Sequence, residues 1–152
     1  MISMTATGHA VIGTVIAAKI GNPALAIPLA LASHVAADFF PHWDTGFERY
    51  KKSENIFIRN SVVDVIMSFT LSFLLVYFLF PQTSYAYAFI MVIAAQFFDW
   101  ATAPYLFLKW NFPPFTWAYR FQMLFDRPMA KPWGVIGQVA VLAALVFLAI
   151  KF

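Results

Sequence analysis

The sequence contains no cysteine, and only 11% of its 152 residues are charged. The absence of cysteine excludes a disulfide framework, thiolate metal ligands and a thiol nucleophile. Because soluble domains carry about 25% charged residues, the low fraction argues against a water-soluble protein. Apolar residues fill the chain instead, with 62% hydrophobic and 19% aromatic. These proportions predict a single integral membrane domain over residues 1–152.

Five apolar segments are separated by prolines and turn signals. The last three approach or exceed the ~20 residues that a helix needs to cross the hydrocarbon of a bilayer. The first two are shorter, so they either cross a thinned region or form a re-entrant hairpin that enters the membrane and returns. The expected fold is an all-α, polytopic membrane bundle with about five transmembrane segments. They are about Thr5–Ile20, Pro23–Phe40, Ile56–Phe80, about Tyr85–Leu108, and Trp133–Ile150.

The basic residues predict how this bundle lies in the membrane. Eight of the ten fall in or beside the loops on the side of the amino terminus, and only Lys19 and Lys151 fall on the other side. Positive loops stay in the cytoplasm, so the amino terminus is expected there, in an inner membrane. We interpret the net charge of +3 as an indication that the chain contacts anionic lipid. We expect no nucleic-acid partner. The sequence is compatible with a homo-oligomer.

The stretch from Lys109 to Pro132 differs from the five apolar segments. It alternates aromatic residues such as Trp117 and Phe121 with polar ones such as Arg120 and Gln122. This pattern is typical of an interfacial segment that lies among the lipid headgroups.

Ionisable residues inside the apolar segments are the chief functional candidates, because charge within a bilayer is costly. His34 and Asp38 are four residues apart and share one face of a helix. Under the topology above, the other candidates lie at similar depths, within roughly 5–15 Å of the cytoplasmic interface. Imidazoles and carboxylates without thiolates suit Zn²⁺, Mn²⁺ or Fe²⁺, and a carboxylate-rich subset suits Mg²⁺, so one or two divalent ions are expected. The expected metal ligands are His9, His34, Asp38, His42, Asp64 and Asp99.

A metal ion in such a place predicts hydrolysis, since it activates water and polarises a phosphoryl oxygen. The leading hypothesis is a metal-dependent hydrolase at the cytoplasmic leaflet that acts on a phosphoester or lipid-type substrate. The expected catalytic residues are His42, Asp44 and Asp99. Arg59 and Arg120 are expected to hold the substrate phosphate.

Two other functions use the same residues differently. A divalent-cation or proton transporter would use them as a pathway, although the outer halves of the segments are almost free of polar residues to continue it. A non-catalytic assembly protein would use them only for helix association. Structural roles are also open for single residues: a carbonyl partner for His9, an ion pair with Arg59 for Asp38, and a turn for Asp44.

The start of the chain resembles the YdjM-like family of membrane-bound, metal-dependent hydrolases. The resemblance lies in Gly8-His9, a short apolar hairpin, and then the Asp-x-x-Pro-His-x-Asp order that ends at Asp44. It covers about the first third of the chain, and it implies His9, Asp38, His42 and Asp44 as ligands. Members of the family tend to carry a later histidine motif, whereas this chain has no histidine after His42. Asp64 and Asp99 are the candidates to replace that motif.

Overall fold

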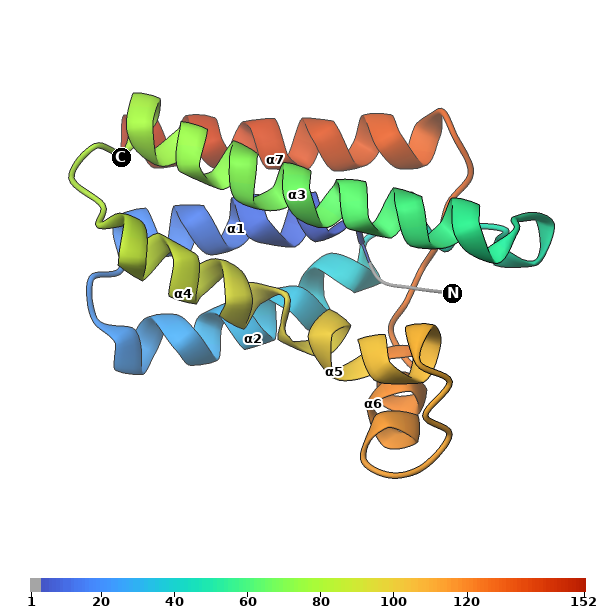
Figure 1. The fold of residues 1–152 in the computed structure, drawn as a ribbon. Coiled ribbons are helices and arrows are strands. Elements are labelled where there is room, and N and C mark those ends of the chain that lie inside the picture. The colour runs from blue at the N-terminus through green and yellow to red at the C-terminus, as the bar shows by residue number, and fades with distance from the viewer. Residues whose placement is uncertain (1–3) are drawn as a thin grey trace.

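The computed structural model describes residues 4–152, and within that range the chain folds into seven α-helices and one short 3-10 helix, with no strand. Figure 1 shows α1, α2, α3 and α7 running alongside one another, with α6 set off at one end. The all-α fold expected from the sequence is therefore confirmed. The elements are α1 (Ala6–Lys19), α2 (Pro23–Phe39), η1 (Arg49–Lys51), α3 (Glu54–Leu79), α4 (Tyr85–Ala95), α5 (Phe97–Phe107), α6 (Phe115–Gln122) and α7 (Trp133–Lys151).

The number of membrane spans is smaller than expected from the sequence. Two helices, α3 with 26 residues and α7 with 19, are long and apolar enough to cross a membrane. The helices α4 and α5 make a third candidate if they count as one span, although they are bent by 57° relative to each other. These two to three candidates are fewer than the five expected, because α1 has only 14 residues and α2 only 17. The alternative for the first two segments, a re-entrant hairpin, leaves three. At 1.5 Å per residue these helices reach about 21 and 25 Å, short of the ~30 Å hydrocarbon layer.

Helix α1 is the centre of the bundle. It packs against α2, α3, α4 and α7, and residues on every side of it are buried. Its apolar side chains therefore contact other helices. The side chains of a lipid-facing helix would contact acyl chains. Thr5 caps its amino end by accepting a hydrogen bond from the backbone N–H of Gly8.

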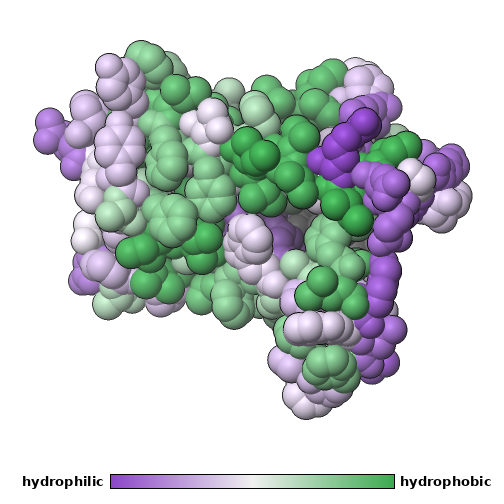
Figure 2. All heavy atoms as spheres, viewed as in Figure 1, coloured by the Kyte–Doolittle hydropathy of each residue, from purple (hydrophilic) through white to green (hydrophobic). Residues whose placement is uncertain are grey.

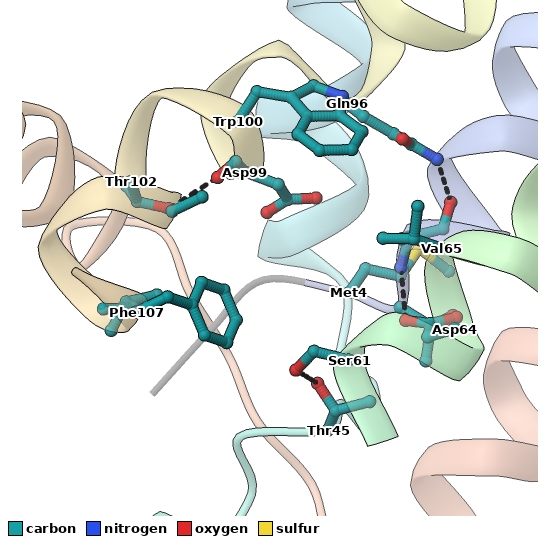
Figure 3. A pocket seen from close by; sticks show the side chains of 14 residues that line it. Met4, Thr45, Ser61, Asp64, Val65, Gln96, Asp99, Trp100, Thr102 and Phe107 are labelled. Carbon is teal, nitrogen blue, oxygen red and sulfur yellow. Dashed lines mark hydrogen bonds between the residues drawn. The ribbon is translucent and has the colours of Figure 1, made fainter. Parts of the chain in front are cut away.

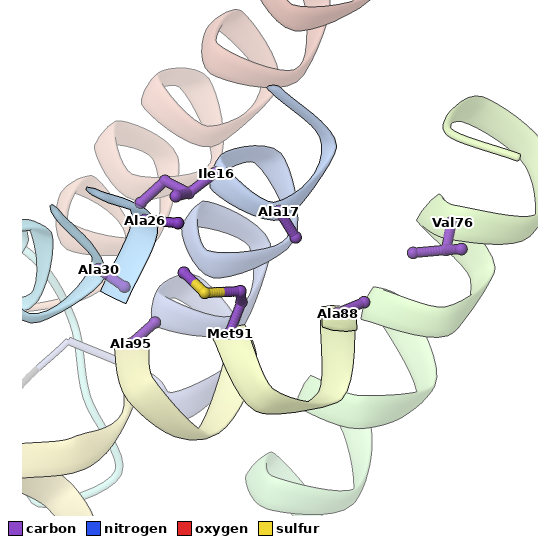
Figure 4. Packing of buried hydrophobic residues seen from close by; sticks show 8 residues of the cluster. All are labelled: Ile16, Ala17, Ala26, Ala30, Val76, Ala88, Met91 and Ala95. Carbon is purple, nitrogen blue, oxygen red and sulfur yellow. The ribbon is translucent and has the colours of Figure 1, made fainter. Parts of the chain in front are cut away.

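Small residues let the neighbouring helices approach α1 closely. Figure 4 shows alanines from α2 and α4 turned inward around Ile16 and Ala17 of α1. A Cβ atom built on Gly13 would lie 2.7 Å from the carbonyl oxygen of Met91. Close helix packing in membranes depends on such small residues. Gly13 therefore allows α4 to approach α1 closely.

The outer surface of the bundle is apolar along its length and polar at its two ends (Figure 2). Large hydrophobic side chains of α3 and α7 are exposed on it, for example Ile66 at 59% and Phe147 at 63%. Contiguous apolar surface of this kind is what a lipid-facing bundle presents. The loop before α3 and the segment around α6 lie at one end, and the α3–α4 turn and the end of α7 lie at the other (Figure 1).

The fourth apolar segment is broken at Gln96, where one continuous helix was expected. The buried Gln96 side chain donates hydrogen bonds from Nε2 to the carbonyl of Ala6 and to Oγ of Ser68, both at 2.9 Å. Gln96 ends α4, and α5 begins at the next residue in a new direction. Asp99 consequently lies in the first turn of α5, where a carboxylate is favoured by the helix dipole. Tyr105 of α5 stacks on Tyr119 at 4.4 Å between ring centroids, which joins α6 to this helix.

Candidate metal centre

One buried face of α2 supplies the first half of the centre. Ala26, Ala30, His34 and Asp38 follow at four-residue spacing, and all four are buried. The alanines allow close packing, and the two polar residues come last, near the end of the bundle that carries most of the cations. The expected juxtaposition of His34 and Asp38 is present, with 3.3 Å between His34 Nε2 and Asp38 Oδ2.

Helix α1 brings His9 against this pair. The rings of His9 and His34 are stacked, with centroids 3.8 Å apart. Asp38 Oδ1 lies 3.2 Å from His9 Nε2 and accepts a 2.6 Å hydrogen bond from the backbone N–H of Met4. The side chains of His9, His34 and Asp38 have no solvent exposure. The cluster is therefore closed to bulk water on the sides of α1 and α2.

The fourth member is Asp99 of α5. Its Oδ1 lies 3.9 Å from His34 Nε2, and ligand atoms of His9, His34 and Asp99 all lie within 4.8 Å of one another. The Nδ1–H of His34 donates to the carbonyl of Ala95 at 2.7 Å, so Nε2 is the ring atom that faces the carboxylates. Gln122 of α6 donates to Asp99 Oδ1 at 2.8 Å. Sequence reasoning assigned Gln122 no role at this centre, because it belongs to the interfacial segment.

A second group of the same chemistry forms from His42, Asp44 and Asp126. Their ligand atoms also lie within 4.8 Å of one another, and all three residues are buried. The expected His42 and Asp44 thus lie together, but with Asp126 as their partner. Asp126 was treated only as a polar residue of the interfacial segment. The sequence gives only a weak signal for Asp126, since this residue lies in an aromatic stretch that is distant from His42 and Asp44 in the chain.

Electrostatics in this second group reflect its burial. Burial raises the pKa of the Asp44 carboxyl to about 7, and the Asp126 carboxylate contributes to the rise. His42 lowers it in part, as do the backbone N–H groups of Gly46 and Phe47. For His42, burial disfavours the charged ring, but contact with Asp126 and with the Phe40 carbonyl holds its pKa above the ordinary value.

Asp64 is placed differently from the other expected ligands. Its carboxylate accepts hydrogen bonds from the backbone N–H groups of Ala6 and Thr7, at 2.8 and 3.1 Å, and from Thr7 Oγ1 at 2.7 Å. It therefore caps the amino end of α1 from the neighbouring helix α3. Among the described residues it joins neither group of potential metal ligands. A ligand role for Asp64 stays a prediction.

A pocket opens between α3 and α5 beside the first group, with an empty volume of about 540 Å³ that includes its mouth. Figure 3 shows Asp99 directed into it from α5 and Asp64 on its opposite wall. Figure 2 shows a hollow on this face with hydrophilic atoms inside an apolar surround. Its wall is mainly apolar and includes Val65, Trp100, Ala103, Leu106 and Phe107.

The two expected phosphate-binding cations lie on the surface. Arg59 on α3 and Arg120 on α6 are both exposed. Over residues 4–152, neither forms an ion pair with a carboxylate. Both belong to the half of the molecule that carries the two His and Asp groups.

No family model, curated protein or solved structure matches this chain. The side chains, their contacts and the pocket therefore carry the functional argument.

Proposed function

We propose that this chain is a metal-dependent hydrolase embedded in the inner membrane, acting at the cytoplasmic leaflet on a phosphoester of lipid type. The observation that carries the proposal is the position of Asp99. This carboxylate belongs to the buried His and Asp group and also lines the apolar pocket. Hydrolytic sites need this arrangement, because the group that handles the reacting water must reach both the metal and the substrate.

The donor set fits a divalent cation of the Zn²⁺, Mn²⁺ or Fe²⁺ class. Two imidazoles and two carboxylates converge in a site without a thiolate. Apart from the contacts between Asp38 and the two imidazoles, His9 Nε2 and Asp38 Oδ2 are buried and make no hydrogen bond, and a cation would satisfy both atoms. When bound, such a cation polarises a phosphoryl oxygen and lowers the pKa of water.

The residues of the chain have separate tasks in this proposal. Asp38 lies against Nε2 of both imidazoles, where it would share the cation with them, and the Ala95 carbonyl fixes the ring of His34 so that Nε2 faces the centre. Asp99 is the general base, because its side chain is 18% exposed whereas those of His34 and Asp38 are fully buried. Gln122 positions Asp99 through its amide.

The pocket favours a lipid-type substrate over a soluble one. Its walls of aromatic and aliphatic side chains suit an acyl chain, and it lies between two helices whose outer faces are apolar. Exposed Arg59 and Arg120 are available for the phosphate. The cytoplasmic side follows from the excess of basic residues at this end. The resemblance of the first third of the chain to YdjM-like hydrolases supports the same function.

The test uses the purified full chain in nanodiscs, loaded with Zn²⁺ or Mn²⁺. We expect release of phosphate or headgroup from phospholipid-type phosphoesters, with far lower turnover of soluble p-nitrophenyl phosphate. Asp99→Asn should lower turnover by at least about 100-fold. The surface variant Glu48→Gln, which removes only an exposed ion pair with Lys51, should match the wild type.

Absence of phosphoester hydrolysis by metal-loaded wild type would overturn the proposal. Uptake of labelled Mn²⁺ into proteoliposomes, blocked in the Asp99→Asn variant, would support the transporter in its place. Absence of both activities, together with absence of bound metal, would leave the assembly role.

A further inference from the structure

The group formed by His42, Asp44 and Asp126 joins two segments that are distant in the sequence. His42 and Asp44 lie between α2 and η1, and Asp126 lies between α6 and α7. His42 Nε2 is 3.4 Å from Asp126 Oδ1, and both side chains are almost completely buried, at 0% and 1% exposure. None of the three residues lines the pocket between α3 and α5.

The ring orientation of His42 points to a positive charge at the centre of this group. Its Nδ1–H donates to the carbonyl of Phe40 at 2.7 Å. A neutral ring therefore turns the lone pair of Nε2 toward a carboxylate oxygen of Asp126, which is repulsive unless a cation lies between them. A proton on Nε2 relieves this contact with Asp126, whereas a divalent cation would contact both Asp126 and Asp44.

Within the protein, the carboxylates have only weak partners, namely His42 beside Asp126 and the backbone N–H groups of Gly46 and Phe47 beside Asp44. In the described part of the chain, none of the four buried carboxylate oxygens of Asp44 and Asp126 accepts a hydrogen bond of good geometry. Among the described residues, neither Lys52 nor Lys131 forms an ion pair with these carboxylates, since Lys52 donates to the carbonyl of Thr45 and Lys131 lies over the ring of Trp43. Two buried carboxylates with such weak donors are costly, and a divalent cation compensates both.

The backbone holds these ligands in a fixed frame. The N–H of His42 donates to the carbonyl of Arg127 at 3.3 Å, and the N–H of Met129 donates to the carbonyl of His42 at 2.6 Å. The N–H of Arg127 donates to the carbonyl of Asp38 at 3.1 Å. Gly134 admits the start of α7 against this frame, because a Cβ there would lie 2.9 Å from the backbone nitrogen of Trp43. The three ligands are thus preorganised by backbone contacts that do not use their side chains.

We infer that His42, Asp44 and Asp126 bind a second divalent cation, separate from the His9, His34, Asp38 and Asp99 centre, and that this second site is structural. One imidazole and two carboxylates suit Zn²⁺ or Mn²⁺. The cation ties the segment after α6 to the loop after α2, which keeps Gln122 in place beside Asp99. The inference does not rest on hydrolysis, because metal binding and chain order are measured without a substrate.

The test counts metal ions in the purified full chain after loading with Zn²⁺ or Mn²⁺ and removal of the excess. We expect two equivalents in wild type, one in Asp126→Asn and one in Asp44→Asn. The exposed variant Glu48→Gln is the matched carboxylate control and should keep two. One equivalent in wild type, or two retained in both Asp44→Asn and Asp126→Asn, overturns the inference.

A second measurement needs no variant and therefore does not depend on mutant folding. Wild-type protein is followed by hydrogen exchange while a chelator removes the metal. We expect exchange over residues 123–132 to rise at least tenfold and to recover when Zn²⁺ or Mn²⁺ is restored. Unchanged exchange in this segment, with metal shown to be gone, contradicts a structural cation. Failure of hydrolysis with both of these results intact would count against the proposed function only.

Discussion

The imidazole rings of His9 and His34 lie parallel, with their centroids 3.8 Å apart and their planes 9° apart. Two protonated rings this close would repel each other in a buried site, and neutral rings avoid this repulsion. A neutral imidazole is the form that ligates metals. Asp38 contacts both rings through different oxygens. The stack therefore favours a cation shared by the two rings over two separate ion pairs.

This relationship predicts the effect of Asp38→Asn. The amide keeps the shape of the side chain but removes the charge that holds both rings. We expect the metal affinity of the first centre to fall by about 10-fold to 100-fold. Metal competition with a fluorescent chelator measures this change, and circular dichroism checks the fold. Unchanged affinity in Asp38→Asn would show that the carboxylate serves only to pair with the imidazoles.

Asp64→Asn should affect stability and leave the metal content unchanged. The Asp64 carboxylate accepts two backbone N–H groups and a hydroxyl at the start of α1. Losing charge-assisted hydrogen bonds of this kind costs about 1–3 kcal/mol, which should appear as a lower Tm in detergent. Thr7→Val removes only the hydroxyl contact and should cost less. If Asp64→Asn also loses an equivalent of metal, Asp64 is a ligand after all.

The sequence revealed the parts of the site that are local or that repeat along one helix. The His34 and Asp38 pair follows from four-residue spacing on α2, and burial of that face was expected from the cost of charge in a membrane. Asp126 was missed because it joins His42 through a single backbone bridge between His42 and Pro128. Such a bridge between remote loops has no periodic signal in the sequence.

Hydropathy was also unable to separate contact with lipid from contact with other helices. Helix α1 is apolar enough to resemble a membrane segment, yet its residues face α2, α3, α4 and α7. The break at Gln96 had a similar cause, because the hydrogen bonds of this amide to Ala6 and Ser68 depend on tertiary packing. Asp64 stood out as a charge in an apolar run, but its partner is the end of a distant helix.

Gly134→Ala and Gly137→Ala should change stability in opposite directions. A Cβ on Gly134 would lie 2.6 Å from the carbonyl oxygen of Met129, so the start of α7 must move away from the frame. We expect a loss of about 1–3 kcal/mol, as for other overpacked sites. A Cβ on Gly137 would make only ordinary contacts, with the ring of Phe40 at 3.5 Å and the carbonyl oxygen of Pro41 at 4.0 Å. Alanine there should stabilise the helix by about 0.5–1 kcal/mol. Thermal unfolding in one detergent measures both, and equal effects would contradict the tight approach at Gly134.

The sidedness of the molecule is testable because the chain has no cysteine, so each introduced cysteine is the only one. Tyr50 is 82% exposed and lies in η1 at the end with most of the cations. Gln82 is exposed in the turn between α3 and α4 at the opposite end. If the positive end is cytoplasmic, a membrane-impermeant maleimide should label Gln82→Cys in intact spheroplasts and Tyr50→Cys only after permeabilisation.

The reverse labelling pattern would move both His and Asp groups to the outer leaflet. The proposed hydrolase would then meet substrate and metal outside the cell, and the basic end would need another explanation than the positive-inside rule. Labelling of both positions from one side has a stronger consequence. It would mean that α3 does not cross the membrane between residues 54 and 79, although its 26 residues exceed the length that a span requires. Orientation and spanning are therefore separated by the same pair of variants.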